Sequence, residues 1–173
     1  MSTWIFEPGH TEAEFKARHM MVSWVRGLFK DIHGTLELDF DRCLEATFEG
    51  EIDATGIWTG QPQRDEHLRS ADFFNVKEFP TMTFESTKVE KTGEKTAKLH
   101  GNVTLLGQTK PAVFDVTFNK IAPHPVPTYK GILTAGFSIR GTIKRTDWGM
   151  KLGVPALSDE IALYIEIESN EKK

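Results

Sequence analysis

The chain has 173 residues, enough to bury one substantial core, and we expect a single domain over 1–173. Acidic residues outnumber basic ones by 25 to 21, and no basic stripe of the kind that binds nucleic acid is present. The only cysteine, Cys43, excludes an intramolecular disulfide and a cysteine-built zinc site. No segment approaches the roughly 18 apolar residues of a membrane span, so we expect no integral membrane association. The first residues lack a signal-peptide pattern, which favours the cytoplasm.

Eight segments alternate apolar and polar residues with the period of a β-strand. They are residues 11–17, 27–40, 46–53, 81–87, 97–105, 111–119, 132–144 and 160–168. In the second segment this period places Leu28 on the same face as Ile32 and Leu36. Each strand is apolar on one face only, and no helices separate the strands, so the pattern indicates an antiparallel, all-β fold.

Two stretches interrupt the strands. The first, His19–Gly27, is expected to form a short helical turn that stops at Gly27. The second, Arg64–Phe79, combines charged residues with apolar ones at three-residue spacing, and Asp65 is a candidate helix N-cap. We therefore predict a helical flap over about residues 64–79, which Pro80 returns to strand.

Eight sequential antiparallel strands form either a sandwich or an up-and-down barrel. A closed barrel leaves no exposed edge strands, and eight strands surround an interior that is either filled or holds one small ligand. We favour the eight-stranded barrel. Its inward positions alternate large rings such as Phe48 and Phe84 with very small residues such as Gly34, Gly50 and Gly101. Small residues of this kind either accommodate a neighbour's ring or leave an apolar cavity.

Five segments resemble the YceI-like family in order and spacing across nearly the whole chain. They are EFKARHMMVSWVRGLFKDIHGTLELD, RDEHLRSADFFNVKEFPTMTFEST, GNVTLLGQTKPAVFDVTF, IKRTDWGM and SDEIALYIEIE. The resemblance implies an extended lipocalin-like barrel that holds a long apolar chain, typically a polyisoprenoid or an isoprenoid quinone. It also implies frequent homodimers. Many members of this family are exported, which makes the periplasm the alternative location.

From these patterns together with the resemblance we predict a carrier or sequestering protein for a polyisoprenoid, isoprenoid quinone or fatty chain, with no catalytic residue and no required cofactor. The flap residues Leu68, Phe73 and Phe74 would close one end of the barrel. The predicted ligand-contacting residues are Phe15, Ala17, His19, Met20, Trp24, Phe29, Phe48, Gly50, Leu68, Phe73, Phe74, Met82, Phe84, Val103, Phe137, Ile139 and Trp148.

Two other functions stay open at this point. The six histidines show neither HxH nor HExxH spacing, so we predict no metal site. His19 or Asp147 could serve as the acid–base group of a lipocalin-like enzyme, although a hydrogen bond to a turn carbonyl is the commoner use of a histidine placed like His19. Alternatively, the barrel could be filled, and the protein could be a stress-induced interaction protein that acts through its surface.

Overall fold

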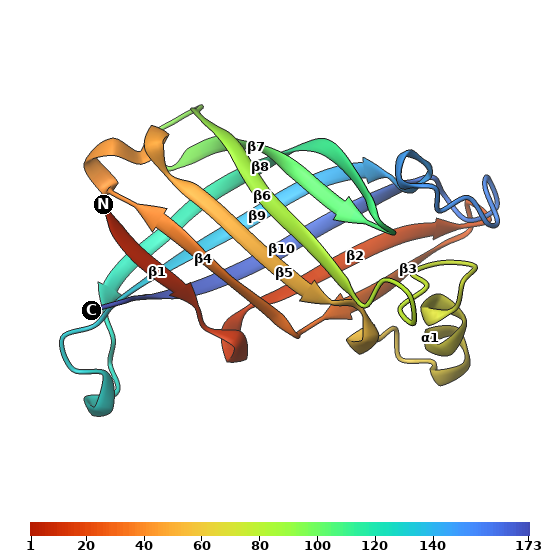
Figure 1. Ribbon diagram of the computed structural model, residues 1–173, viewed down its shortest axis with the longest axis horizontal. Coiled ribbons are helices and arrows are strands. Elements are labelled where there is room, and N and C mark those ends of the chain that lie inside the picture. Colours follow the sequence, from red (N-terminus) through yellow and green to blue (C-terminus); the bar gives the residue numbers. More distant parts are fainter.

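The computed structural model describes residues 1–173 as an elongated barrel with both termini at the same end (Figure 1). The strands are β1 (Ser2–Phe6), β2 (Glu12–His19), β3 (Ser23–Phe29), β4 (Ile32–Leu38), β5 (Thr47–Asp53), β6 (Thr81–Lys91), β7 (Thr96–Leu105), β8 (Gln108–Pro123), β9 (Leu133–Lys144) and β10 (Glu160–Glu171). One α-helix, α1 (Pro62–Arg69), joins β5 to β6. Short 3-10 turns are η1 (Pro8–His10), η2 (Phe40–Glu45), η3 (Ala54–Gly56), η4 (Pro127–Tyr129) and η5 (Arg145–Trp148).

The ten strands occupy eight positions around a closed antiparallel barrel. β1 and β2 follow one another along β10, pairing with its C-terminal and N-terminal parts, and η1 separates them. β3 and β4 likewise share one position, because β3 pairs with β2 while β4 pairs with β1 and β5. The pairing of β1 with β10 closes the ring. The predicted eight-stranded barrel is therefore confirmed.

The predicted helical turn at His19–Gly27 is wrong. Residues 20–22 form a three-residue turn, and the chain then enters strand β3. Val25, Gly27 and Phe29 alternate inward along β3, while Met20, Val22 and Trp24 are exposed. The apolar residues that suggested a helix therefore do not pack on a core, which is why their spacing misled the prediction.

Two further departures lie near the N-terminus. The strand β1, in which Trp4 and Phe6 alternate inward, was not predicted. The predicted face of residues 27–40 is also wrong at its start, because the chain breaks between β3 and β4. Across this break Phe29 and Ile32 are both buried, whereas Leu28 is only partly buried and its backbone pairs with Trp58.

Residues 54–80, here called the cover, lie along the edge of β3 that does not pair with another strand. The cover runs from the end of β5 to the start of β6, and α1 lies at the end of the barrel opposite both chain termini (Figure 1). The helix is shorter than predicted and begins earlier, at Pro62, where the Gln61 side chain accepts a hydrogen bond from the Arg64 amide. Asp65 is therefore not the N-cap. Turns rather than helix follow Arg69, because Ser70 ends the helix and its hydroxyl donates to the His67 carbonyl at 2.6 Å.

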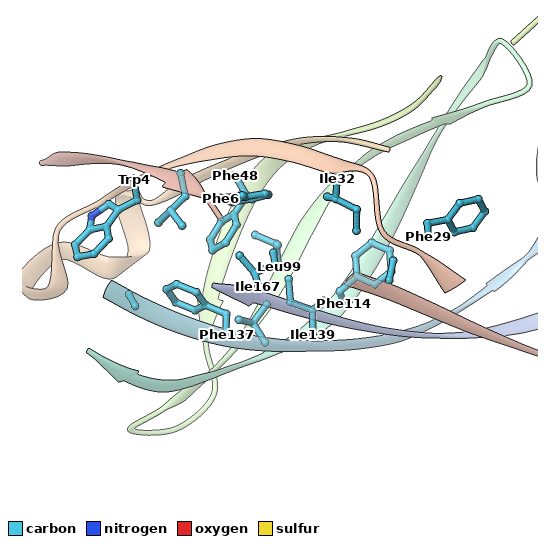
Figure 2. Packing of buried hydrophobic residues seen from close by; sticks show 14 of the residues in the cluster. Trp4, Phe6, Phe29, Ile32, Phe48, Leu99, Phe114, Phe137, Ile139 and Ile167 are labelled. Carbon is cyan, nitrogen blue, oxygen red and sulfur yellow. The ribbon is translucent and has the colours of Figure 1, made fainter. Parts of the chain in front are cut away.

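Aromatic side chains fill the end of the barrel that holds the termini. The Trp4 ring meets Phe40 at 5.9 Å between ring centroids, and Phe137 meets both Phe48 and Phe118 at 5.7 Å. Figure 2 shows Trp4, Phe6, Phe48 and Phe137 gathered at this end, with Phe29 lying farther along the barrel. These rings close the interior on this side, here called the closed end.

Inward glycines serve two different purposes along the barrel. A Cβ atom at Gly34 would collide with the Phe6 ring, and one at Gly101 would collide with the Phe84 ring. These two glycines make room for a neighbour's aromatic ring. At Gly50 the nearest neighbour of a Cβ atom would be the Phe6 ring at 3.7 Å, an ordinary contact distance, so a side chain could be accommodated there without a collision.

Candidate functional site: an apolar cavity in the barrel

The barrel encloses a cavity of about 690 Å³ on the side of the cover. Of its 39 lining residues 28 are hydrophobic, and the volume falls within the roughly 300–1,000 Å³ typical of small-molecule sites. Phe6, Phe48, Leu99 and Ile167 form its floor, next to the aromatic residues of the closed end. A space of this size lined mainly by hydrocarbon suits an apolar ligand better than a polar one.

Branched aliphatic and small residues form the walls. Ile161, Leu163 and Ile165 contribute from β10, and Ala13 and Ala17 from the neighbouring strand β2. All five residues border the cavity, although rings are present in this half too, since Phe15 covers Gly27 of β3. The alternation of the strands thus produces a tunnel rather than a filled core in this half of the barrel.

The cover closes part of this space with Leu68, Phe73 and Phe74. The Phe74 ring meets Phe29 of β3 edge to face at 5.5 Å, which attaches the cover to the free edge of β3. These three residues were predicted to close the barrel, and all three lie in the cavity lining.

Polar contacts hold the cover in this position. Asp65 is buried, and its carboxylate accepts hydrogen bonds from the Thr59 amide at 2.8 Å and from the Thr59 hydroxyl. The Arg69 guanidinium donates to the carbonyls of Thr55 at 2.8 Å and Ile57 at 3.2 Å. Two charged residues of α1, Asp65 and Arg69, thus bind the preceding loop.

Residues 149–158 form a second loop at the cavity mouth, and Arg145 organises it. Its buried guanidinium donates to the carbonyls of Ser158 at 2.8 Å, Leu157 at 2.8 Å and Met150 at 3.1 Å. Burial lowers the pKa of Arg145 below its ordinary value, while the charge of Asp159 opposes that shift. Arginine nevertheless stays protonated at neutral pH. The cation therefore acts as a fixed donor that shapes the loop.

The lining includes thirteen of the predicted ligand-contacting residues. They are Phe15, Ala17, His19, Phe29, Phe48, Gly50, Leu68, Phe73, Phe74, Met82, Phe84, Val103 and Ile139. Four others lie outside it. Met20 and Trp24 are exposed, Phe137 belongs to the closed end, and Trp148 is buried with Phe73, its indole donating to the Val103 carbonyl at 3.0 Å. Contact of these residues with a ligand stays a prediction.

Sequence patterns missed other parts of the lining. Phe114, Ile161 and Leu163 were on predicted inward faces, so the alternation alone could have included them. Leu152 and Leu157 come from the loop before β10, where no strand or helix period exists to indicate the side that faces the interior. Hydrogen bonds from Arg145, together with backbone bonds to the end of β2, place this loop over the barrel.

Charged lining residues concentrate near solvent. Glu14 is partly buried, and Glu49, Glu51, Arg64 and His67 are exposed, so Arg145 is the one buried ion of the lining. His67 lies 2.8 Å from Asp72, and both side chains are more than half exposed. No three or more His, Cys, Asp or Glu side chains are grouped so that they could hold a metal ion. None of the helices is long and apolar enough to cross a membrane.

A model of the YceI-like domain matches residues 4–169, nearly the whole barrel. The chain belongs to this family. YceI-like relatives include a UPF0312 protein of Pseudomonas putida, which is 35% identical over 167 residues, spanning 96% of this chain and 84% of the relative. A UPF0312 protein of Pseudomonas savastanoi is 36% identical over the same shares of the two chains.

Solved structures share the YceI-like barrel. The Campylobacter jejuni YceI protein is 34% identical, with a TM-score of 0.79 over 90% of each chain. Burkholderia cenocepacia BcnA reaches a TM-score of 0.83 at 17% identity, covering 94% of this chain and 98% of its own. A polyisoprenoid binding domain from Saccharophagus degradans reaches 0.76 at 11% identity, covering 99% and 100%. The last two likenesses establish the fold alone.

Proposed function

We propose that this protein binds a long apolar chain inside its barrel, such as a polyisoprenoid or the tail of an isoprenoid quinone, and carries or sequesters it without catalysis. The observation that supports the proposal best is the 690 Å³ cavity lined mainly by hydrocarbon side chains. A solved domain of the same fold is described as binding polyisoprenoids, which agrees with this use of the barrel.

The cavity volume limits the part of the ligand that the barrel encloses. At about 30 Å³ for a water-sized group, 690 Å³ holds on the order of 20 non-hydrogen atoms, or roughly four five-carbon units. At roughly 0.3 kcal/mol per atom, 20 atoms correspond to a Kd of tens of micromolar. A longer chain would leave its remaining units, and any head group, at the mouth. We therefore expect selectivity for chain length rather than for head group.

The two other functions have less support. A filled barrel with a purely surface-based role conflicts with the cavity. An enzyme would need titratable side chains that converge inside the pocket. His19 and Asp147 are both exposed, and Asp147 is not part of the lining. Cytoplasmic location and homodimer formation stay predictions.

Native mass spectrometry of freshly purified protein, followed by organic extraction, tests the proposal. We expect a stoichiometric prenyl or acyl chain, or uptake of one when the protein is incubated with geranylgeraniol. The matched control is Gly50→Leu, which directs a side chain into the cavity where a Cβ atom has its nearest neighbour at 3.7 Å. A mass that stays that of the bare chain after incubation, with wild-type protein folded, would refute the proposal.

A further inference from the structure

Exposed apolar side chains gather on two segments beside the cavity mouth. The first is the turn between β2 and β3 with the start of β3, and the second is the loop before β10. Together they form what we call the apolar rim: Met20, Met21, Val22, Trp24, Leu152 and Val154. Val22 is 81% exposed and Met21 70%, which is unusual for side chains of this kind near a binding site.

Backbone hydrogen bonds place the two segments side by side. The Met20 amide donates to the Ala156 carbonyl at 2.6 Å, and the Ser158 amide donates to the Arg18 carbonyl at 3.0 Å. His19 and Leu152, one from each segment, also line the cavity. In Figure 1 the turn after β2 and the loop before β10 lie together at the end of the barrel that carries α1. The apolar rim is therefore continuous with the cavity mouth.

The turn itself keeps two methionines where the backbone disfavours them. Met20 and Met21 have φ values of 53° and 57°, and the Val22 amide donates to the His19 carbonyl at 2.9 Å. Turn positions with positive φ, such as these two of the three-residue loop 20–22, prefer Gly or Asn, because a Cβ atom is strained there. Unfavourable residues at such positions, with their side chains in solvent, indicate a role for these side chains other than folding.

The charge around the rim is one-sided. The chain contains 25 Asp and Glu, yet neither 16–30 nor 148–158 contains any. These two segments contain Lys16, Arg18, Arg26, Lys30 and Lys151, and only Arg26 forms an ion pair, with Glu14 at 3.7 Å. The Arg18 guanidinium lies 4.7 Å from the centre of the Trp24 ring. Exposed tryptophan and aliphatic groups surrounded by cations match the chemistry of a bilayer surface with anionic head groups.

The other end of the barrel supplies a contrast. Phe40 and Leu44 are also exposed, at 41% and 57%, but they lie in η2. Three carboxylates, Asp39, Asp41 and Glu45, lie within or next to the same turn, and the one cation among them, Arg42, is paired with Asp39 and Glu45. An anionic surface would repel this end, so the charge distribution favours one orientation.

We propose that the apolar rim docks the mouth of the barrel onto an anionic lipid bilayer. This inference rests on the proposed function, because an apolar chain then moves between bilayer and cavity without crossing water. Met20, Met21 and Trp24 enter the interfacial region, and Lys16, Arg18 and Lys151 contact the lipid phosphates. The barrel does not span the bilayer in this arrangement; it rests on the surface by its rim.

Vesicle flotation of the full chain tests the docking, using phosphatidylcholine vesicles with and without phosphatidylglycerol. Wild-type protein is expected to float with the anionic vesicles, and added salt is expected to weaken the binding by screening. The double variant Met20→Asn, Met21→Gly suits the turn better than the natural residues. We therefore expect it to be at least as stable as the wild type and to bind vesicles about ten-fold more weakly. Lys151→Glu should weaken binding about five-fold, and the control Leu44→Ser should leave it unchanged.

Two results would overturn the proposal: wild-type protein that does not float with anionic vesicles, or a double variant that floats as well as the wild type. Sedimentation velocity adds a third, since a dimer that the double variant converts to monomer, without vesicle binding, would make the rim a contact between two copies. Titration with geranylgeraniol in the absence of vesicles separates this proposal from the proposed function. Chain binding without flotation refutes only the docking, while flotation without chain binding refutes the carrier function.

Discussion

The two ends of the barrel are built from the same strands but differ in what fills them. At the closed end, rings from neighbouring strands interlock, as Phe137 does with Phe48 and Phe118. At the end with the cover, aliphatic walls and small residues surround about 690 Å³ of space. The comparison shows that inward alternation specifies a barrel, while the sizes of facing residues decide whether the barrel is a core or a container.

The two ends also differ in how the sheet is completed. At the closed end β1 pairs with both β4 and β10, so the ring is continuous. At the other end β3 pairs along one edge with β2, and its other edge has only the single bridge from Leu28 to Trp58. The cover occupies the place of the missing strand neighbour. A cover held mainly by side-chain contacts is easier to displace than a fully hydrogen-bonded strand, which would suit the proposed entry of a ligand at this end.

The largest effect is expected from removing a ring at the closed end. Phe137→Ala should lower the free energy of unfolding by about 3–5 kcal/mol, because the ring is buried and its partners cannot close the space. Leu163→Ala, on the cavity wall, should cost less than about 2 kcal/mol, since one side of Leu163 already faces empty space. Urea denaturation of both variants measures the difference. Equal losses would show that the two ends are packed alike.

A paired test uses the two glycines that face each other across β4 and β5. Gly34 and Gly50 are register partners, and the Phe6 ring is next to both, but only at Gly34 would a Cβ atom collide with it and with the Glu49 carbonyl oxygen. Gly34→Ala should destabilise the fold by about 1–3 kcal/mol through overpacking. Gly50→Leu should keep stability within about 1 kcal/mol and weaken geranylgeraniol binding at least about ten-fold by occupying the cavity.

Thermal unfolding and ligand titration of both glycine variants provide the measurements. Normal ligand binding by Gly50→Leu would place the chain outside the barrel. A Gly34→Ala variant as stable as the wild type would contradict the close approach of the Phe6 ring.

A smaller and more local effect is expected in the cover. Asp65→Ala removes the acceptor of the Thr59 amide and hydroxyl, at a cost of about 1–3 kcal/mol. Hydrogen exchange should accelerate in α1 and residues 54–61 but not in β8 or β9, and a bound chain should dissociate faster. The matched control is Glu66→Ala, an exposed neighbour whose loss should change stability by less than about 0.5 kcal/mol. Uniform acceleration across the barrel would argue against a separately opening cover.

The smallest effect concerns pH. Hydrogen bonds from the Thr146 amide and hydroxyl lower the pKa of Asp159, and bonds from the Thr55 hydroxyl and amide lower the pKa of Asp53. Both carboxylates hold turns at the cavity end. A lowered pKa means that the unfolded chain binds more protons, so stability is complete above the unfolded value near about 3.9 and falls as the pH drops through the folded value.

Denaturation at a series of pH values between neutrality and this acidic range measures the effect. Asp159→Asn should reduce the loss of stability on acidification. If acidification lowers the stability of Asp159→Asn as much as that of the wild type, other carboxylates cause the effect. One candidate is Asp39 at the closed end, whose pKa is also lowered, chiefly by a hydrogen bond from the Asp41 amide.

The alternation of apolar and polar residues could reveal the strands, because each strand has one solvent-exposed face and one buried face. This pattern depends only on residues that are close together in the sequence. It failed where the chain changes direction: the break between β3 and β4 moved Leu28 off the inner face, and the exposed rim residues Val22 and Trp24 resembled a helical pattern. The predicted helix was correct in existence but not in its start, because the interaction of Asp65 with Thr59 is not visible in the order of residues. The loop that Arg145 positions over the cavity carried no periodic signal at all.

The sequence by itself determined the all-β class, the eight positions of the barrel and most of the residues that face inward, since these depend on a period of two within each strand. Only the tertiary structure decided which small residues lie under a ring and which border empty space, because that depends on register between strands. Gly34 and Gly50 are both inward glycines beside Phe6, and only their positions in the register leave no room for a Cβ atom at Gly34 and ordinary contact distance at Gly50, which lines the cavity. The same holds for the apolar rim, whose two segments are more than 100 residues apart in the chain and meet through the hydrogen bond from the Met20 amide to the Ala156 carbonyl.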